Sequence, residues 1–564
     1  MIPFRRTIQV ISLAVFILLL FMSAFPAAAV MNLDLFLRLD PIIVIGTALS
    51  SKTFSLVFLP AVIVLILVPV LGRIFCGYIC PMGTTIDGSD KLFGNRIKDN
   101  NQSGKLRTIK YYLLSFLAGA ALLGVSFVFT ASPISLITRF YGMIVYPVLA
   151  FFAEMGLTVI QPLAEKLDLY SIVFAEIPAP RFVAQFFVLI FFILIFVAVK
   201  ISPRFWCRCI CPSGALMAIL SKKPLIRRVV SEECTNCGKC IKSCPMNTIA
   251  KDNPALTRYE ECIVCGTCET VCPVDAVSFS SGLKTDVVDR EISTSRRRFL
   301  YTGFAGVGTA AMSLTGLNSL YGKPGVGQVA VPGLVRPPGA VPEMDFLARC
   351  VRCGECMFAC PNNTLQPIWF KSGFTGLFSP SLTPRRGPCS PECNNCGNVC
   401  PTEAIRPLPL EERIWAKPGT AEINRQRCLA WEHKKRCMVC DEVCPFGAVE
   451  FRIEEGNPVP VPEVTEDKCA GCGYCEHHCP VQNQPAIFVT PMGALRLSDG
   501  SYREQGVQQG LDISLKPKDQ TGSTFLPEDQ SYGFAPGFDV SESIEEAPGF
   551  DVEDKEVIAP GFVK

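Results

Sequence analysis

Long apolar runs dominate the first 200 residues, and their lengths predict membrane-spanning helices. A helix needs about 20 consecutive apolar residues to cross a bilayer. Four stretches meet this requirement: 8–30, 53–72, 111–130 and 182–199. A fifth stretch, 299–320, is richer in Gly and Ala and less apolar, and Glu154 interrupts a sixth, 141–162. We interpret the sixth as a periplasmic or interfacial helix, and we expect a transmembrane helical domain over residues 1–230.

Basic residues between the apolar runs predict the orientation of this domain. Lys and Arg gather before the first stretch, between the second and third, and after the fourth: Arg5, Arg6, Lys91, Arg96, Lys98, Lys105, Arg107, Lys110, Arg204, Arg208, Lys222, Lys223, Arg227 and Arg228. Positive flanks stay in the cytoplasm, so the loops 31–52 and 131–181 should face outward. Ala27-Ala28-Ala29 resembles a signal-peptidase site, but the apolar run is longer than a signal peptide requires, and we favour an uncleaved anchor.

Groups of regularly spaced cysteines dominate the sequence after residue 230. Of the 29 cysteines, six groups of four share the spacing C-x(2, 3 or 8)-C-x2-C-x3-C and are followed at once by proline. This spacing in a long chain indicates ligation of iron-sulfur clusters rather than a disulfide framework. A zinc ribbon would use two separated C-x2-C pairs, and iron prefers thiolate ligands. The sequence therefore predicts six 4Fe-4S clusters.

The first two groups lie close together, within 231–290. They are Cys234, Cys237, Cys240 and Cys244, followed by Cys262, Cys265, Cys268 and Cys272. In the bacterial two-cluster ferredoxin pattern, the fourth cysteine of each group binds the cluster of the other group. We therefore expect Cys272 to join the first three cysteines and Cys244 to join the second three, in a cytoplasmic two-cluster domain.

Four more groups follow within 323–500. They are Cys350, Cys353, Cys356 and Cys360; Cys389, Cys393, Cys396 and Cys400; Cys428, Cys437, Cys440 and Cys444; and Cys469, Cys472, Cys475 and Cys479. The second of these groups widens its first gap by one residue, and the third inserts residues 429–436 between its first two cysteines. The ligand count is intact in each, but the sequence leaves open which groups exchange their fourth cysteine.

Ser295-Arg296-Arg297-Arg298-Phe299-Leu300 stands directly before the fifth apolar stretch. This pattern is typical of a twin-arginine export signal, although basic residues precede many membrane spans. A domain with clusters would be assembled in the cytoplasm and exported folded, which favours the export signal. We expect a signal and anchor helix over 291–322 and a periplasmic four-cluster domain over 323–500.

The last stretch, 501–564, is polar, acidic and rich in Gly and Pro, and a disordered tail is expected there. The sequence Ala-Pro-Gly-Phe recurs in it at Ala535, Ala547 and Ala559. The repeat is either a low-complexity feature without a role or a multivalent docking motif.

The five remaining cysteines lie in two similar segments. Residues 73–83 and 204–214 share the pattern R-x-aromatic-C-x2-I-C-P-x-G, and each follows an apolar stretch. Two copies related within the membrane would bring Cys76, Cys80, Cys207 and Cys211 to one place. We interpret these cysteines as an additional redox or metal site, against the alternative of helix-ending turns whose cysteines only pack. Cys209 lies outside the repeat and receives no role.

Other kinds of chemistry find no support in the sequence. The net charge of +2 gives no reason to expect nucleic acid as a partner. There is no haem-attachment motif, no nucleotide-binding glycine loop and no further cofactor motif, and the three histidines, His433, His477 and His478, all lie among the cysteine groups. We interpret His433 as a surface residue. No catalytic residue is assigned, so the chain should relay electrons rather than act as a stand-alone enzyme.

These motifs carry a family resemblance. Residues 1–290 resemble the NapH-type membrane ferredoxins, through the paired C-x3-C-P loops, the two-cluster pattern and the segment 132–139. Residues 295–500 resemble the NapG/MauM-type periplasmic ferredoxins, and here the two types are fused in one chain. The resemblance implies a multidomain protein with a helical transmembrane domain and α+β ferredoxin-like modules. It implies a location in the bacterial inner membrane, with quinol as substrate and a periplasmic reductase or cytochrome as electron acceptor.

Two other functions stay open on the sequence. A cytoplasmic ferredoxin-type donor would send electrons across the membrane to the periplasm, and this explains the cytoplasmic clusters better than quinol oxidation does. Alternatively, the chain would be an accessory or maturation factor of a respiratory reductase. Arg139 and Glu154 are candidates for a quinone site only because ionisable groups near apolar segments tend to be functional; each is otherwise an interfacial residue.

Overall fold

The computed structural model describes residues 2–23, 34–53, 55–93, 106–170, 180–281, 300–301, 303–312, 334–370 and 373–516. Residues 1–516 form one compact unit, and residues 517–564 form a second unit that lies outside the described residues. The candidate cleavage site at 27–29, the twin-arginine residues 295–299 and the Ala-Pro-Gly-Phe repeat also lie outside them.

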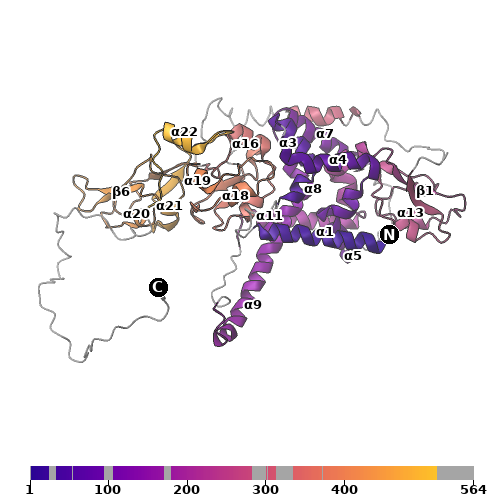
Figure 1. Cartoon of the computed structure of the whole chain (residues 1–564), viewed down its shortest axis with the longest axis horizontal. Coiled ribbons are helices and arrows are strands. Elements are labelled where there is room, and N and C mark those ends of the chain that lie inside the picture. The colour runs from indigo at the N-terminus through magenta and orange to yellow at the C-terminus, as the bar shows by residue number, and fades with distance from the viewer. Residues whose placement is uncertain are drawn as a thin grey trace. The chain divides into compact units, whose positions relative to one another are not determined.

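A helical bundle contains the apolar stretches of the first 200 residues (Figure 1). The four predicted spans correspond to α1 (Ile2–Met22), α4 (Leu59–Leu71), α7 (Thr108–Leu122) and α11 (Gln185–Val197). Shorter helices that the hydropathy pattern alone does not single out lie between them and after the last one: α3 (Pro41–Ser51), α5 (Pro81–Phe93), α8 (Pro133–Phe140) and α12 (Pro212–Leu220). α3 packs against α7, and α12 packs against both.

Several helices are shorter than their apolar runs. Within the described residues, only Phe4–Met22 and Pro133–Lys166 are both long and apolar enough to cross a membrane. Leu56–Leu71, Thr108–Leu122 and Gln185–Lys200 fall below that length. In the predicted span 111–130, the helix ends at Leu122 because Gly124 adopts a positive φ of 84° that an L-residue rarely takes up.

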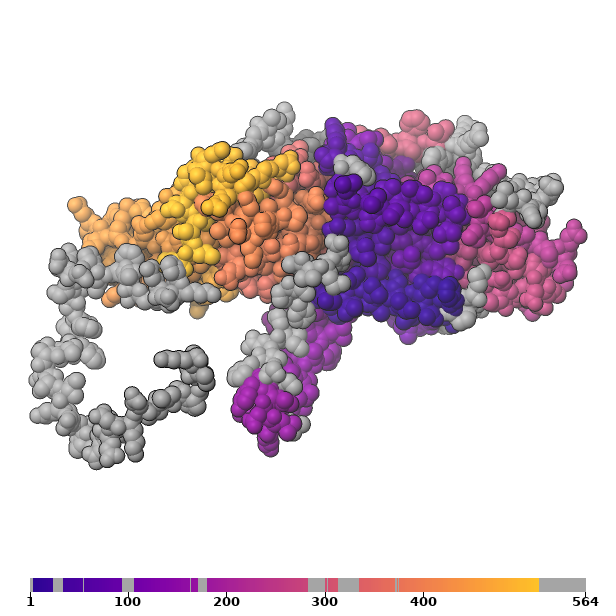
Figure 2. Space-filling view, in the orientation of Figure 1, coloured from indigo at the N-terminus to yellow at the C-terminus, as the bar shows by residue number. Residues whose placement is uncertain are grey.

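The interfacial helix expected at 141–162 is part of a much longer run. α8 continues through the π-helical turn η5 (Tyr141–Val145) into α9 (Tyr146–Lys166). Glu154 does not interrupt this run, because glutamate is a good helix former. The side chains of α9 are mostly exposed, and Figure 2 shows this helix standing clear of the bundle. The helix expected at 141–162 is therefore present within the longer run Pro133–Lys166, and its periplasmic or interfacial location stays a prediction.

The fifth apolar stretch contributes the helix Gly303–Met312, which crosses α7 closely. A Cβ atom placed on Gly306 would lie 2.7 Å from Ser115 Cβ and 2.8 Å from the Phe116 nitrogen. Tyr112 and Thr309 share a hydrogen bond of 2.7 Å across the same contact. Small residues that admit close backbone approach are typical of helix pairs in membranes.

The cysteine-rich regions form small α+β modules with two-stranded antiparallel sheets. The strand pairs are β1 (Ile226–Val230) with β2 (Val277–Ser281), β3 (Leu365–Pro367) with β4 (Pro380–Leu382), β5 (Thr420–Ile423) with β8 (Ile487–Thr490), and β6 (Val449–Arg452) with β7 (Val461–Val464). A helix of four or five residues carries the third cysteine of each group: α13 (Lys239–Ser243), α14 (Thr267–Thr270), α17 (Glu355–Phe358), α18 (Asn395–Asn398), α20 (Val439–Glu442) and α21 (Tyr474–His478).

Glycine is required before these short helices only in the regularly spaced groups. Gly238, Gly266, Gly354 and Gly473 follow the second cysteine and have φ values between 70° and 85°. The two groups with a widened first gap have Asn394 and Met438 at this position, with φ near −126° and −119°. The longer gap thus removes the need for a left-handed residue.

The last element among the described residues lies beyond the predicted domain end at residue 500. α22 (Tyr502–Gln508) begins after Ser501, whose hydroxyl accepts a hydrogen bond from the Glu504 N–H. Tyr502 is fully buried, and its N–H donates to Glu412 at 2.7 Å. Because this side chain is needed to complete an apolar cluster of the module, the expected disordered tail begins too early in the sequence.

Candidate iron-sulfur sites

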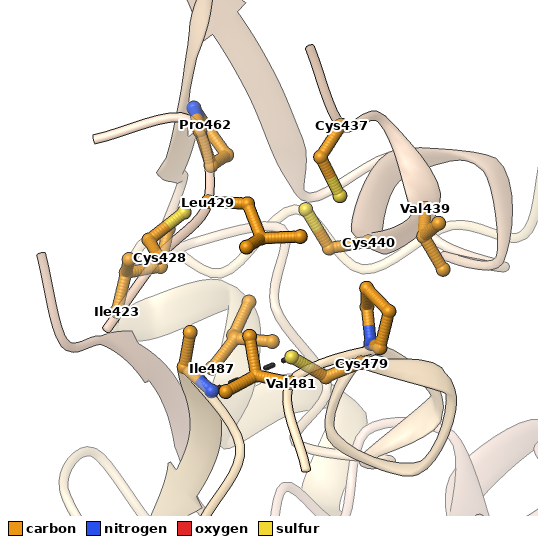
Figure 3. A pocket seen from close by; sticks show the side chains of 12 residues that line it. Ile423, Cys428, Leu429, Cys437, Val439, Cys440, Pro462, Cys479, Val481 and Ile487 are labelled. Atoms are coloured by element: carbon orange, nitrogen blue, oxygen red, sulfur yellow. Dashed lines mark hydrogen bonds between the residues drawn. The ribbon is translucent and has the colours of Figure 1, made fainter. Parts of the chain in front are cut away.

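Three cavities in the C-terminal modules are each lined by four cysteines from two different groups. Cys428, Cys437, Cys440 and Cys479 line the first, of about 390 Å³, and Figure 3 shows three of their sulfurs turned toward the space between them. Cys389, Cys393 and Cys396 line the second together with Cys360. Cys469, Cys472 and Cys475 line the third together with Cys444. The cavities therefore pair the third group with the fourth and the fifth with the sixth, with the fourth cysteines exchanged.

A fourth set completes this pattern. Burial raises the pKa of the Cys356 thiol well above its usual value, and the charges of Cys353, Cys350 and Cys400 raise it further. Desolvation raises the pKa of the half-buried Cys400 thiol to about 11, although hydrogen bonds from backbone N–H groups act in the opposite direction. One environment is therefore shared by Cys350, Cys353, Cys356 and Cys400. This set is the one expected when Cys360 binds in the site of the next group and Cys400 takes its place.

The two groups of 231–290 show the same kind of arrangement. Burial raises the pKa of Cys268 to about 12, against the lowering effect of Arg228, and Cys265 and Cys244 add to the rise. Cys240, Cys244, Cys268 and Cys272 meet in one small apolar cluster. Cys237 is exposed, so the site of the first three cysteines is the more open of the two.

The cysteine sets fit 4Fe-4S clusters. Buried thiols with raised pKa values would stay protonated on their own, and bound iron is what stabilises them as thiolates. Within the described part of the chain, no three Cys, His, Asp or Glu side chains converge tightly enough for a single metal ion. A 4Fe-4S cluster is instead bound by four thiolates that surround it at separate positions. The four cysteines that line each of the three cavities are arranged in this way.

Hydrogen bonds to the sulfurs accompany three of the exchanged cysteines. Cys400, Cys444 and Cys479 each accept an N–H bond at 3.4 Å, from Ile405, Ala448 and Ala486. Such donors stabilise the reduced, more negative state of a cluster and tune its potential.

Arg413 makes the shortest contact between a side chain and a sulfur in the described C-terminal modules, and it gives a testable consequence. Its buried guanidinium donates to Cys389 Sγ at 2.8 Å. Because the positive charge favours the reduced state, Arg413→Gln should lower the potential of the site at Cys360, Cys389, Cys393 and Cys396. A fall on the order of 60 mV corresponds to a tenfold change in the reduction equilibrium. Potentiometric EPR measures it, with Arg406→Gln as control; a potential unchanged relative to this control contradicts the assignment.

The two C-x3-C-P loops are structural copies of each other. Each contains a π-helical turn, η3 (Phe75–Ile79) and η7 (Trp206–Ile210). Cys80 and Cys211 follow with nearly equal backbone angles, φ −61° and ψ 115° against φ −60° and ψ 112°. Both N–H groups donate to the carbonyl five residues earlier, at 2.9 Å. The repeated sequence pattern thus has a repeated backbone.

The loops bring their four cysteines together. Burial raises the pKa of Cys80 well above its usual value, and the charges of Cys76, Cys207 and Cys211 follow as further causes. Cys76 Sγ also lies 3.4 Å from Met217 Sδ on α12. The four thiols singled out by the sequence pattern therefore occupy one buried environment.

The arginine and the glycine of the repeat pack across the pair of loops, a role the sequence pattern alone did not reveal. A Cβ atom on Gly214 would lie 2.6 Å from Arg73 Nη2, and one on Gly83 would lie 3.8 Å from Arg204 Nη2. Both guanidinium groups are fully buried. Each loop therefore extends its arginine to the glycine of the other.

A different carboxylate neutralises the positive charge of each of these arginines. Arg73 pairs with Glu261 at 2.8 Å, and Arg204 pairs with Asp87 at 2.5 Å. Burial alone would raise the pKa of Asp87, but Arg204 and Arg5 outweigh burial and lower it to about 2. Asp87 is thus a stable anion between two buried cations.

The loops contact the two-cluster domain directly. The Tyr78 hydroxyl donates to the Val264 carbonyl at 2.9 Å, and a Cβ atom on Gly77 would lie 2.7 Å from the Ile263 carbonyl oxygen. Cys76 packs on the apolar cluster that contains Ile263 and Cys265. The cysteine site of the loops therefore adjoins the site of Cys262, Cys265, Cys268 and Cys244.

On its other side, the loop site adjoins the C-terminal modules through Asp40. The buried Asp40 carboxylate accepts hydrogen bonds of 2.8 Å from Ser213, beside Cys211, and from Ser132. Ser135, one helical turn further on, donates to the Val351 carbonyl at 3.1 Å. Cys80, Cys207 and Cys211 share one apolar core with Cys350, Cys353 and Cys356. Sequence reasoning missed Asp40, whose only signal is its position as N-cap before Pro41.

None of the three histidines lines these three cavities. His433 and His478 are exposed and His477 is half-buried. The His478 ring stacks on Tyr474, and its Nδ1 contacts the Tyr474 carbonyl oxygen at 3.0 Å. Cys209 is fully buried.

Comparisons with sequence families identify 4Fe-4S domains in every cysteine-rich region except that of Cys389, Cys393, Cys396 and Cys400. Families described as 4Fe-4S binding domain match residues 52–98 and 184–231, which contain the two loops, and residues 347–366. Families described as 4Fe-4S dicluster domain match residues 233–277 and 434–483. The loops therefore resemble a known iron-sulfur sequence family.

Curated relatives of the C-terminal part of the chain are also ferredoxin-type proteins. The methylamine utilization ferredoxin-type protein MauM of Methylorubrum extorquens is 35% identical over 207 residues, which are 35% of this chain and 90% of the relative. MauM of Paracoccus denitrificans is 39% identical over 28% of this chain and 71% of its own length. The ferredoxin-type protein NapG of Escherichia coli is 34% identical over 31% of this chain and 78% of its own length. The chain therefore belongs to the family of MauM- and NapG-type ferredoxin proteins, which are iron-sulfur electron-transfer proteins.

Proposed function

We propose that this chain is a membrane-bound relay with six 4Fe-4S clusters that passes electrons from the quinol pool to a periplasmic reductase or cytochrome. The observation that carries the proposal is the set of four-cysteine sites in the C-terminal modules, which belong to the same compact unit as the helical bundle. In this proposal residues 1–290 act as a NapH-type membrane ferredoxin fused to a NapG/MauM-type partner. The match of both loops to a 4Fe-4S family supports a further cluster at Cys76, Cys80, Cys207 and Cys211.

The residues of the chain perform four tasks in this scheme. The cysteines hold the clusters, which supply reversible one-electron transfer. Backbone N–H groups and Arg413 stabilise the reduced state at the sulfurs. Arg73 and Arg204 hold the two loops against each other. The apolar core around Cys350, Cys353 and Cys356 keeps water away from the path.

A second candidate is a relay from a cytoplasmic ferredoxin-type donor across the membrane to the periplasm. The contact of Cys76 with Ile263 and Cys265 favours it, because this contact joins the two-cluster domain to the loops. Quinol oxidation at the C-terminal modules would not need that connection. The two candidates share the outward end of the path and differ in where electrons enter.

Reduction of the clusters by each donor separates the candidates. We expect EPR signals of reduced clusters to grow when a menaquinol analogue is added to the anaerobically purified full chain. Cys207→Ala should leave this reduction intact, because the loops do not lie between quinol and the C-terminal modules. No reduction by quinol, together with reduction by a low-potential ferredoxin that Cys207→Ala abolishes, would reject the first candidate in favour of the second.

A further inference from the structure

One cavity of the described chain lies outside all the cysteine sites. It measures about 660 Å³, including its open mouth. α8, α11, the segment η4 (Val128–Thr130) and the C-terminal modules line it together. Its walls carry six aromatic side chains: Phe129, Phe187, Phe191, Phe192, Trp369 and Phe378. Such walls suit a flat, apolar ring.

A single charged side chain lines this cavity. Arg139 is 7% exposed, and its guanidinium lies 5.0 Å from the centre of the Phe378 ring. It donates to the carbonyl oxygens of Phe129 and Ser135 and, among the described residues, pairs with no carboxylate. A guanidinium has five N–H donors, so it can still bind an oxygen atom of a ligand.

The charged end of the cavity adjoins a cysteine site. A Cβ atom on Gly354, the residue after Cys353, would lie 3.3 Å from Arg139 Cγ. A ligand oxygen at Arg139 would therefore lie next to the loop that contains Cys350, Cys353 and Cys356. This places a reducible or oxidisable ring beside the first cysteine site of the C-terminal modules.

The opposite end of the cavity leads to an apolar surface. Phe187 lines the cavity and is 56% exposed, and its ring lies 4.5 Å from that of Trp369. On the same helix, Phe186 is 66% exposed and Leu194 is 63% exposed. In the proposed membrane setting, these side chains face lipid, so a ligand with an apolar tail can enter from the bilayer.

We infer that this cavity binds the head group of a lipid-soluble quinol, with Arg139 donating a hydrogen bond to one ring oxygen. The inference rests on the proposed function and assigns its entry site. Two O–H bonds of the quinol break, giving the quinone. Both protons leave to water past Thr130, which lines the cavity and is exposed. Both electrons pass singly to the site of Cys350, Cys353, Cys356 and Cys400 and to the adjoining set, each of which would hold a cluster. Arg139 positions the ring, and the aromatic walls hold it flat.

Labelling with a photoreactive azido-quinone in membranes that contain the full chain tests this assignment. Thr130 lines the cavity and is exposed. The indole ring of Thr130→Trp should therefore fill the cavity without removing a buried side chain. We expect labelling of cavity residues, mapped by mass spectrometry, to fall about tenfold in this variant. Thr158→Trp, at an exposed position on α9 outside the cavity, is the matched control and should label normally. Arg139→Gln should also reduce labelling, with iron content as the check on folding.

The possible outcomes distinguish a failure of the assigned cavity from a failure of the proposed function. Labelling confined to the cavity, and lost in Thr130→Trp, supports the assignment. Labelling elsewhere while quinol still reduces the clusters overturns the cavity and leaves the proposed function standing. An absence of both labelling and reduction overturns both. Displacement of the label by an alcohol with the same tail as well as by quinone shows binding of an apolar chain only, and it overturns the assignment.

Discussion

Cys479→Ala should remove about four irons from the site of Cys428, Cys437 and Cys440 while leaving the site of Cys469, Cys472 and Cys475 loaded. The reason is the exchange of fourth cysteines: Cys479 lines the cavity of the preceding group, and Cys444 lines the cavity of the following group. Alkylation of the native protein followed by mass spectrometry measures which thiols lose their iron. We expect Cys428, Cys437 and Cys440 to become reactive.

Cys444→Ala is the matched control and should give the reciprocal result. Its effect should fall on Cys469, Cys472 and Cys475. Loss of protection within the same sequence group in either variant would contradict the exchanged arrangement. Because both cysteines are buried and both precede a proline, a general folding defect should affect the two variants alike.

Glu261→Ala should destabilise the contact between the two-cluster domain and the loops by about 3–5 kcal/mol. Glu261 pairs with the fully buried Lys110 and Arg73, at 2.5 Å and 2.8 Å. Burial would raise its pKa, but these two cations lower it to about 2, so the carboxylate is charged at neutral pH. Its removal leaves two buried cations without a counter-charge, which is far costlier than losing a surface pair.

Denaturant unfolding of the full chain, read by loss of cluster absorbance, measures this cost. Glu450→Ala removes an exposed pair with Lys468, whose side chains are 51% and 39% exposed, and should change stability by less than about 1 kcal/mol. Equal effects of the two variants would show that Glu261 is not the main link. Partial recovery in Lys110→Met with Glu261→Ala would locate the cost in the unpaired charge.

Local spacing was enough to predict the chemistry of the cysteine groups, because each group is a short loop followed by a helical turn. The same spacing left the exchange in the C-terminal half open, since the exchange depends on which modules pack together. The repeat of residues 73–83 and 204–214 predicted the gathering of Cys76, Cys80, Cys207 and Cys211. It did not reveal why each copy contains an arginine and a glycine, because that contact joins residues more than 100 positions apart.

Hydropathy located the helices better than it located their ends. The run 111–130 stays apolar past Leu122, although Gly124 ends the helix through its backbone conformation. Glu154 interrupts the apolar run 141–162, but a single charge leaves the helix there intact. Asp40 carried no sequence signal beyond a helix cap, since its two serine partners lie 92 and 173 residues away.

The iron and acid-labile sulfide content of the anaerobically purified full chain tests the central claim most directly, because every other inference requires the clusters. Six 4Fe-4S clusters predict about 24 irons and as many sulfides per chain. A cluster at the two loops would add about four of each, and Cys76→Ala with Cys211→Ala would remove only that addition. A content near two-thirds of this value or less, or iron without matching sulfide, would contradict a six-cluster relay.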